Sequence, residues 1–229
     1  MPTVTDIRAP RRGSKVRVIV LDDAEWRATS IEVLAPLGVR VGDPVDPDEL
    51  AGRLERAEPG RARERALRLL SFKERSAHEV RKRLVDDGYC EDVSASVVAD
   101  LERSGLVDDE RFARVLARSL TEIRGLGGSR VLRELAAKGV DADLARRALD
   151  EFLPPDAEAA AAAEMAARLA LRADARTDRI AGRLVRKGFA PALALRASRD
   201  AMAHADGESV PEGGEYDLDE HVDLHERTP

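Results

Sequence analysis

The feature that most constrains the fold of this chain is a sequence pattern that occurs three times. Each copy contains an apolar residue, a leucine four residues later, a glycine four residues after that, and then another apolar residue. Corresponding positions in successive copies lie 51 and then 49 residues apart. Such internal similarity is typical of a protein built from tandem structural units. The copies are Val80-Leu84-Gly88-Tyr89, Val131-Leu135-Gly139-Val140 and Ile180-Leu184-Gly188-Phe189.

The glycine of each copy predicts the end of a helix. A glycine just after the last helical residue adopts a left-handed conformation without the steric cost of a Cβ atom. The apolar residue that follows then packs back onto the leucine in the last helical turn. Gly105, between Leu101 and Leu106, predicts the same ending for a further helix. In the three copies we expect contacts between Leu84 and Tyr89, Leu135 and Val140, and Leu184 and Phe189.

Around this pattern, apolar residues recur at helical spacing and predict about three helices in each unit. Ser76 and Glu79 form a capping box that starts the middle helix of the first unit, and Phe112 belongs to the apolar stripe that opens the second. One such unit is too small to bury its apolar faces well alone. We therefore predict an all-α fold of three-helix units stacked in an elongated, curved array. The predicted units are residues 61–106, 107–153 and 154–204.

The segments on either side of the repeats have a different pattern. Residues 15–29 alternate around Asp22-Asp23, which predicts a β-hairpin. A short helix that ends at Pro36 and a helix from about Asp48 complete a predicted extension over residues 15–60, joined to the repeats near Pro59-Gly60. Disorder is predicted for residues 1–14 and for the acidic tail 205–229, which has nine acidic residues against one arginine.

Composition excludes several classes of function. The chain has 38 basic and 44 acidic residues and a net charge of −6, although residues 61–204 alone have four more basic than acidic residues. The single cysteine, Cys90, rules out an internal disulfide and a four-cysteine zinc site. No apolar run approaches the roughly 20 residues of a membrane span. We expect a cytoplasmic chain that is not an enzyme and binds no metal, cofactor or membrane.

Three motifs resemble sites of chemistry. The loop 125–130, Gly-Leu-Gly-Gly-Ser-Arg, lacks the preceding strand and the Gly-Lys-Ser/Thr ending of a nucleotide-binding loop. We interpret it as a flexible connection between helices. Binding of an anion from a nucleic acid or a protein stays open as the alternative. His221 and His225 have metal-ligand spacing, but no apolar periodicity supports a helix in the acidic tail. Asp108-Asp109-Glu110 opens a helix whose N-terminal dipole it complements, with Asp108 as the N-cap.

Basic residues recur on the predicted middle helix of each unit. A single charged helix face is usually only solvated. If the units stack in register, however, these faces form a discontinuous basic groove that suits phosphates or an acidic protein surface. Few aromatic residues lie among them, so base-specific reading of single strands is not expected. The candidate binding residues are Arg81, Lys82, Arg83, Arg130, Arg133, Lys138, Arg179, Arg183, Arg186 and Lys187.

These motifs together resemble a known family, the RecX regulatory proteins of bacterial recombination. Residues 105–113, Gly-Leu-Val-Asp-Asp-Glu-Arg-Phe-Ala, are similar to the family signature Gly-hydrophobic-x-Asp-Asp-x-Arg-Phe-Ala. Residues 66–80 resemble its first-unit motif, and Leu135-Ala-Ala-Lys-Gly-Val140 resembles its second-unit Leu-x-x-Lys-Gly-Ile. The chain departs from the family at Gly127-Gly128, where Gly-Pro is commoner, and in its long acidic tail.

The resemblance implies a regulator in DNA repair, the SOS response and homologous recombination, and we expect this chain to be a monomer. Such a protein binds the groove of the RecA–DNA filament and inhibits the ATPase, co-protease and strand-exchange activities of RecA. It implies weak, salt-dependent contact with single- and double-stranded DNA. Two alternatives stay open from the residues themselves: a DNA-binding protein of helix-turn-helix type, and a helical-repeat adaptor for another partner.

Overall fold

The computed structural model describes residues 1–207 and is mostly helical. His221, His225 and most of the predicted acidic tail lie outside the described residues. The strands are β1 (Val4–Arg8), β2 (Val16–Leu21) and β3 (Ala24–Ser30). The α-helices are α1 (Ile31–Leu34), α2 (Pro47–Leu70), α3 (Ala77–Asp86), α4 (Glu91–Arg103), α5 (Asp109–Arg118), α6 (Gly128–Ala137), α7 (Ala142–Phe152), α8 (Pro155–Ala170), α9 (Thr177–Lys187) and α10 (Pro191–Gly207). A 3₁₀ turn, η1 (Ala35–Leu37), and a π-helical turn, η2 (Ser119–Ile123), extend α1 and α5.

The N-terminal extension contains a three-stranded antiparallel sheet of order β1-β2-β3. The predicted hairpin is present as β2 and β3, and Asp22 and Asp23 in its turn have φ values of 48° and 66°. The prediction of disorder for residues 1–14 is wrong, because β1 pairs with β2 and its Val4 is fully buried. Strand β1 has only five residues, which is too short for its alternation of apolar and polar residues to predict a strand from the sequence alone.

Helix α2 crosses the predicted boundary at Pro59-Gly60 without interruption. Pro59 removes one backbone donor, but residues on either side of it, Leu54 and Ala62 among them, stay buried on one face of the same helix. The extension and the first unit are therefore joined by a continuous helix and share one apolar core. At the other end of the chain, α10 continues to Gly207, three residues into the segment predicted as disordered.

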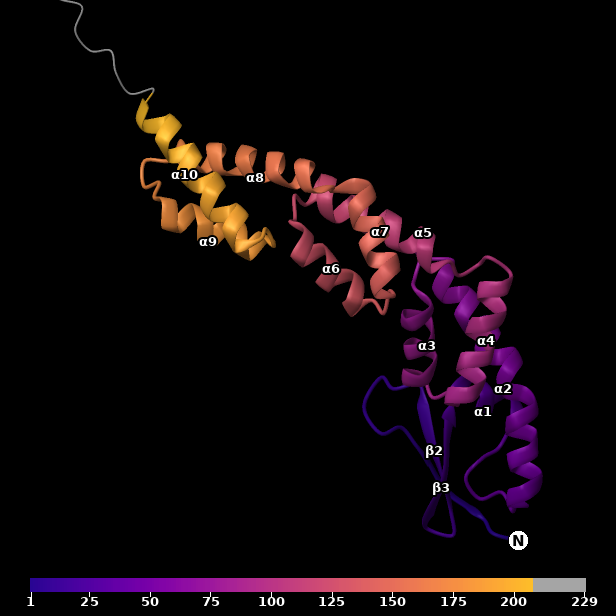
Figure 1. Cartoon of the computed structure of the whole chain (residues 1–229). Coiled ribbons are helices and arrows are strands. Elements are labelled where there is room, and N and C mark those ends of the chain that lie inside the picture. The colour runs from indigo at the N-terminus through magenta and orange to yellow at the C-terminus, as the bar shows by residue number, and fades with distance from the viewer. Residues whose placement is uncertain (208–229) are drawn as a thin grey trace, which may run out of the picture.

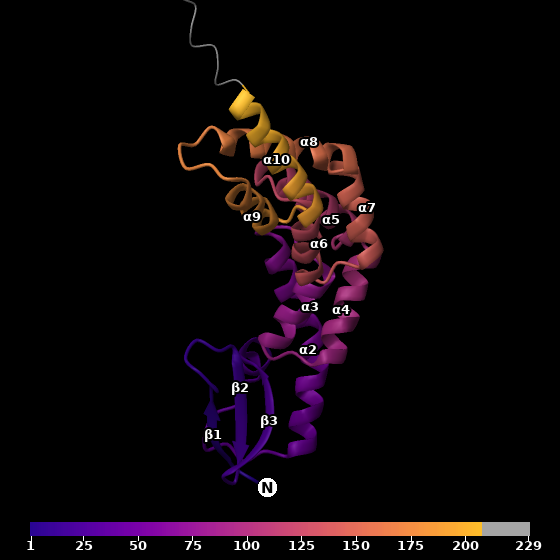
Figure 2. The same ribbon diagram turned by 60° about the vertical axis from the view of Figure 1, so that its left-hand side comes forward.

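The three helical units follow one another in an elongated, curved array, with the sheet at one end and α10 at the other (Figures 1 and 2). In Figure 1 the middle helices α3, α6 and α9 lie on the inner side of the arc. Helices α2, α4, α5, α7 and α8 lie on its outer side. The all-α array of tandem three-helix units predicted from the repeats is thus confirmed, with a small sheet at its N-terminal end.

Each middle helix ends at the glycine of the repeat pattern. Gly88, Gly139 and Gly188 have φ values of 94°, 74° and 103°, which only glycine adopts without strain. The amide of the apolar residue that follows donates to the leucine carbonyl five residues earlier, at 3.1 Å in the first unit and 3.2 Å in the other two. The leucine and this apolar residue belong to the same core cluster in each unit.

Within residues 1–207 the apolar core is divided into three clusters. The sheet and the first unit share one cluster, and the second and third units have one each. We expected the units to stack because one unit buries its apolar faces poorly, but the joints between them are made largely by backbone and polar groups. At the first joint, Ser76 at the start of α3 donates its hydroxyl to the Lys138 carbonyl at the end of α6, at 2.5 Å. Asp109 accepts the Ala77 amide at 2.8 Å, and Arg111 pairs with Glu74 at 2.6 Å.

The second joint repeats this arrangement between α9 and α6. The amides of Gly127 and Ser129, at the start of α6, donate to the carbonyls of Lys187 and Gly188 at 3.0 and 3.1 Å. A Cβ atom on Gly127 would lie 2.7 Å from the Gly188 oxygen, so only glycine fits. Helices α9, α6 and α3 therefore lie head to tail, the C-terminus of each against the N-terminus of the next.

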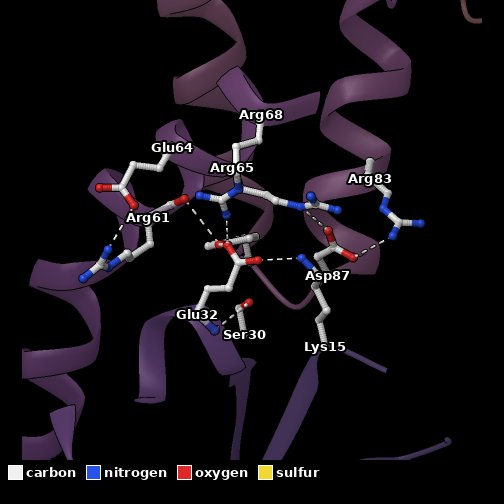
Figure 3. A network of polar contacts seen from close by, with 10 residues as sticks. Lys15, Ser30, Glu32, Arg61, Glu64, Arg65, Arg68, Arg83 and Asp87 are labelled. Atoms are coloured by element: carbon white, nitrogen blue, oxygen red, sulfur yellow. Dashed lines mark hydrogen bonds and ion pairs between the residues drawn. The ribbon is translucent and has the colours of Figure 1, made fainter. Parts of the chain in front are cut away.

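A polar network holds the sheet against the first unit (Figure 3). The Glu32 carboxylate accepts from Lys15 at 2.5 Å and from the Tyr89 hydroxyl at 3.0 Å, and it pairs with Arg68. Burial opposes ionisation of Glu32, but its hydrogen bonds and the nearby cations outweigh burial, so the pKa of Glu32 lies below its ordinary value. Burial, and then the adjacent Glu32 carboxylate, raise the pKa of the Tyr89 hydroxyl.

Candidate functional site

The basic side chains predicted on the middle helices differ in what they contact. In α3 all three form ion pairs within the first unit: Arg81 with Glu91, Lys82 with Asp86 at 2.9 Å, and Arg83 with Asp87 at 3.3 Å. Asp87 is buried and also accepts from Arg65 at 2.7 Å, so Arg83 belongs to the network of Figure 3. The cations of α3 are thus largely neutralised by neighbouring carboxylates.

Three of the predicted residues hold the joints between units. The Lys138 ammonium pairs with Glu79 across the first joint at 2.7 Å. Across the second joint, Lys187 donates to the Arg124 carbonyl at 2.9 Å, and Arg130 donates to the Arg186 carbonyl at 3.2 Å. Their side chains stabilise the array, so their substitution is expected to alter its geometry as well as its charge.

The predicted arginines of the third unit have fewer partners. Arg179, Arg183 and Arg186 line a cavity of 290 Å³ beside α9. Arg179 pairs with Asp174 at 2.9 Å. Within residues 1–207 the guanidinium groups of Arg183 and Arg186 form neither a hydrogen bond nor an ion pair. In α6, Arg133 is similarly exposed and donates only to the Ser129 carbonyl of its own helix.

Sequence reasoning missed two arginines of this cavity. Arg172 and Arg176 line it together with the three predicted residues, so that its wall has five arginines against Asp174 and Asp178. The missed signal was the spacing, because basic residues at 172, 176, 179, 183 and 186 alternate steps of four and three, as on one face of a helix. The first two precede α9, and the prediction counted only residues inside the middle helices.

This arginine cavity (Arg172, Arg176, Arg179, Arg183 and Arg186) can bind an anion by charge and by fork-shaped hydrogen bonding. Guanidinium groups match the oxygens of phosphates and carboxylates two at a time. The excess of three positive charges among its lining side chains is concentrated in the third unit, beside α9. The ordinary electrostatic ligand of such a surface is a nucleic-acid backbone or an acidic protein surface.

The glycine loop at 125–130 is a joint between units. Two of its amides donate to α9 carbonyls, as described above, and the Gly128 amide donates to the Glu158 carboxylate at 2.8 Å. A free anion has no open donor at these three amides. The anion held there is the carboxylate of Glu158 in this chain. The loop connects η2 to α6, as interpreted, and it also forms the contact surface of the second joint.

Other candidate residues have structural roles. Asp108 caps α5 by accepting the Arg111 amide at 2.8 Å, and Phe112 packs against the core of the second unit. Gly105 has a φ of 72° after α4. Within residues 1–207, no group of three or more histidine, cysteine or acidic side chains is placed to hold a metal ion. In the same residues, no helix is both long and apolar enough to span a membrane.

Comparison with family models agrees with this architecture. Residues 62–101 match the model described as RecX, first three-helix domain, and residues 108–149 match RecX, second three-helix domain. A regulatory protein RecX from Corynebacterium efficiens is 35% identical over 150 residues, which cover 61% of this chain and 71% of that protein. Another from Streptomyces coelicolor is 34% identical over 161 residues, which cover 66% of this chain and 86% of that protein.

Solved structures share the fold. A crystal structure of a regulatory protein RecX superposes with a TM-score of 0.57 and 21% identity, and covers 87% of this chain and 100% of the other. RecX from Lactobacillus salivarius gives the same TM-score and identity over 63% of this chain and 96% of its own. The sequence relatives, the two matched domains and the repeat architecture lead to one conclusion: the chain belongs to the RecX family of regulatory proteins.

Proposed function

We propose that this chain binds the RecA–DNA filament along its helical groove and inhibits the ATPase, co-protease and strand-exchange activities of RecA. The observation that supports this most is the head-to-tail alignment of α9, α6 and α3 on the inner side of a curved array. Within residues 1–207, the arginines of this row that have no carboxylate partner are Arg133, Arg183 and Arg186, and the row ends in the arginine cavity. A helical filament is a partner of matching shape.

Inhibition follows from binding several subunits at once. Each unit of the array makes a modest contact, but linked contacts add up to strong binding because the later ones form at high effective concentration. A chain held on successive RecA subunits opposes the relative movements that ATP turnover requires. The chain acts as a monomer, since one copy already presents three similar units. In this proposal it acts in the cytoplasm and without a cofactor.

The arginine cavity also supports a direct contact with DNA. Phosphates bound by Arg183 and Arg186 release counterions, so affinity falls steeply as salt rises. This contact is independent of base sequence and weak for both single- and double-stranded DNA. It favours, as the second candidate function, a DNA-binding protein that competes with RecA for its template.

One titration separates the two functions. RecA from the same organism hydrolyses ATP on single-stranded DNA while this protein is added, and DNA binding by the protein alone is titrated in parallel. Inhibition at concentrations well below those that coat the DNA supports the filament regulator. Inhibition only at coating concentrations favours competition for DNA, and no inhibition favours an adaptor for an unrelated partner.

A further inference from the structure

Three apolar side chains stand out because they are almost fully exposed. Phe72 is 84% exposed, Ile123 is 81% and Leu171 is 83%, whereas the next large apolar residue, apart from the N-terminal methionine, is Val41 at 59%. Exposure of this degree is unusual for Phe, Ile and Leu, and it matters when such residues are arranged regularly. Each of the three lies at the end of the first helix of its unit, before the middle helix begins.

Their positions follow the internal repeat. Phe72 and Ile123 lie four residues before the N-caps of α3 and α6, which are Ser76 and Gly127. Leu171 lies five residues before Arg176, the N-cap of α9. Within residues 1–207, one almost fully exposed large apolar residue thus occurs in each unit, at the same place in its architecture and spaced along the array.

A basic residue follows each of these apolar residues directly. Lys73, Arg124 and Arg172 are exposed, and within residues 1–207 their charged groups form no hydrogen bond or ion pair. By contrast, the three cations of α3 are all paired within the first unit, as described above. Each unit therefore presents one apolar side chain beside one free cation, and we call these three pairs the repeat-loop pairs: Phe72-Lys73, Ile123-Arg124 and Leu171-Arg172.

We propose that the repeat-loop pairs form one docking surface for successive subunits of a protein polymer. Each pair inserts its apolar side chain into an apolar pocket, and the cation beside it meets a carboxylate at the rim of that pocket. A carboxylate is the group whose charge is opposite to that of the cation in each pair. Because the pair occurs three times along the array, we expect a partner that presents the same pocket repeatedly. The proposal rests on the proposed function, in which the polymer is the RecA filament. It assigns protein contact to the loops and DNA contact to Arg176, Arg179, Arg183 and Arg186, while Arg172 belongs both to the third pair and to the wall of the arginine cavity.

The test compares two triple variants of the full chain. Phe72→Ser/Ile123→Ser/Leu171→Ser removes the apolar side chains, and Phe72→Met/Ile123→Met/Leu171→Met keeps them apolar. Val41→Ser/Val115→Ser removes exposed apolar residues elsewhere and serves as the matched control. Binding is measured to RecA filaments on single-stranded DNA, to bare DNA, and to vesicles of anionic phospholipid, with thermal unfolding as the check on folding.

The serine triple variant is expected to bind filaments more than about a hundredfold more weakly than wild type, and each single variant about tenfold. The methionine triple variant and the control bind filaments like wild type, and all variants bind bare DNA alike. Wild-type affinity of the serine variant for filaments overturns the docking surface while leaving the proposed function standing. Failure of wild type itself to bind filaments overturns both, and loss of vesicle binding alone identifies a lipid surface and overturns the protein partner.

The cations give an independent measurement. Lys73→Glu/Arg124→Glu, which leaves the arginine cavity intact, is expected to weaken filament binding most at low salt, because the lost attraction is screened as salt rises. A DNA-only role for these cations predicts an equal loss on bare DNA. Equal losses on filament and DNA therefore overturn the assignment of the loops to protein.

Discussion

The hydroxyl of Ser76 donates to the carbonyl of Lys138 at 2.5 Å, although 62 residues separate the two in sequence. The same oxygen of Ser76 caps α3 by accepting the Glu79 amide at 3.1 Å. One fully buried serine therefore starts a helix and fixes the next unit against it. The sequence motif at this residue predicted the first role and contained no sign of the second.

Replacing Ser76 with alanine is expected to lower the free energy of unfolding by about 1–3 kcal/mol, because a cap and a buried hydrogen bond are both lost. Urea denaturation measures the change. Ser129→Ala is the control, since this serine is exposed at the start of α6 and its hydroxyl forms no hydrogen bond within residues 1–207. Equal stability of the two variants would contradict the role of Ser76 at the joint.

Gly139→Ala and Gly105→Ala separate packing at a joint from backbone strain. Both glycines have positive φ, 74° and 72°, so alanine costs about 1 kcal/mol at either position. A Cβ atom at Gly105 meets nothing within 4 Å, whereas at Gly139 it would overlap the side chain of His78. Gly139→Ala is therefore expected to be about 1–3 kcal/mol more destabilising than Gly105→Ala in urea denaturation.

Glu32 links the docking of the sheet to pH. Its pKa is lower in the folded chain than the ordinary value of 4.5, so its contribution to stability is complete above that value and is lost as pH falls through the folded pKa. Glu32→Gln is expected to lower the midpoint of thermal unfolding at pH 7 and to flatten its decline between about pH 5 and pH 3. Glu64→Gln, which removes only an exposed ion pair with Arg61, is expected to keep the wild-type decline.

Arg183→Glu/Arg186→Glu is expected to weaken DNA binding by at least about tenfold at low salt and to leave thermal unfolding unchanged, because these side chains have no partner within residues 1–207. Arg103→Glu/Arg146→Glu reverses the same number of charges on α4 and α7, on the outer side of the arc. Fluorescence anisotropy with labelled single-stranded DNA compares the two. Equal weakening would mean that net charge, and not the arginine cavity, decides binding.

Local structure could be predicted from the sequence because its causes lie within a few residues. The ends of α3, α6 and α9 depend on a leucine and a glycine four positions apart, and the hairpin turn depends on Asp22-Asp23. Strand β1 could not be predicted in this way, since its stability comes from pairing with β2 and from the burial of Val4.

The candidate site was only partly accessible from sequence for the same reason. Basic residues are visible as letters, but their partners are not: Lys138 meets Glu79 across 59 residues, and Lys187 meets Arg124 across 63. Helical spacing alone could have added Arg172 and Arg176 to the predicted set. Which cations stay unpaired is decided by tertiary packing.

The head-to-tail joints have a mechanical consequence. Two joints in series act as a lever, so that a small rotation where Ser76 meets Lys138 swings the second and third units together, and the displacement is greatest at α10. The curvature of the array is therefore set at the joints, and with it the pitch that the array can follow on the helical partner proposed above. A change at Ser76 or Gly127 can therefore alter this fit without replacing any arginine of α6 or α9.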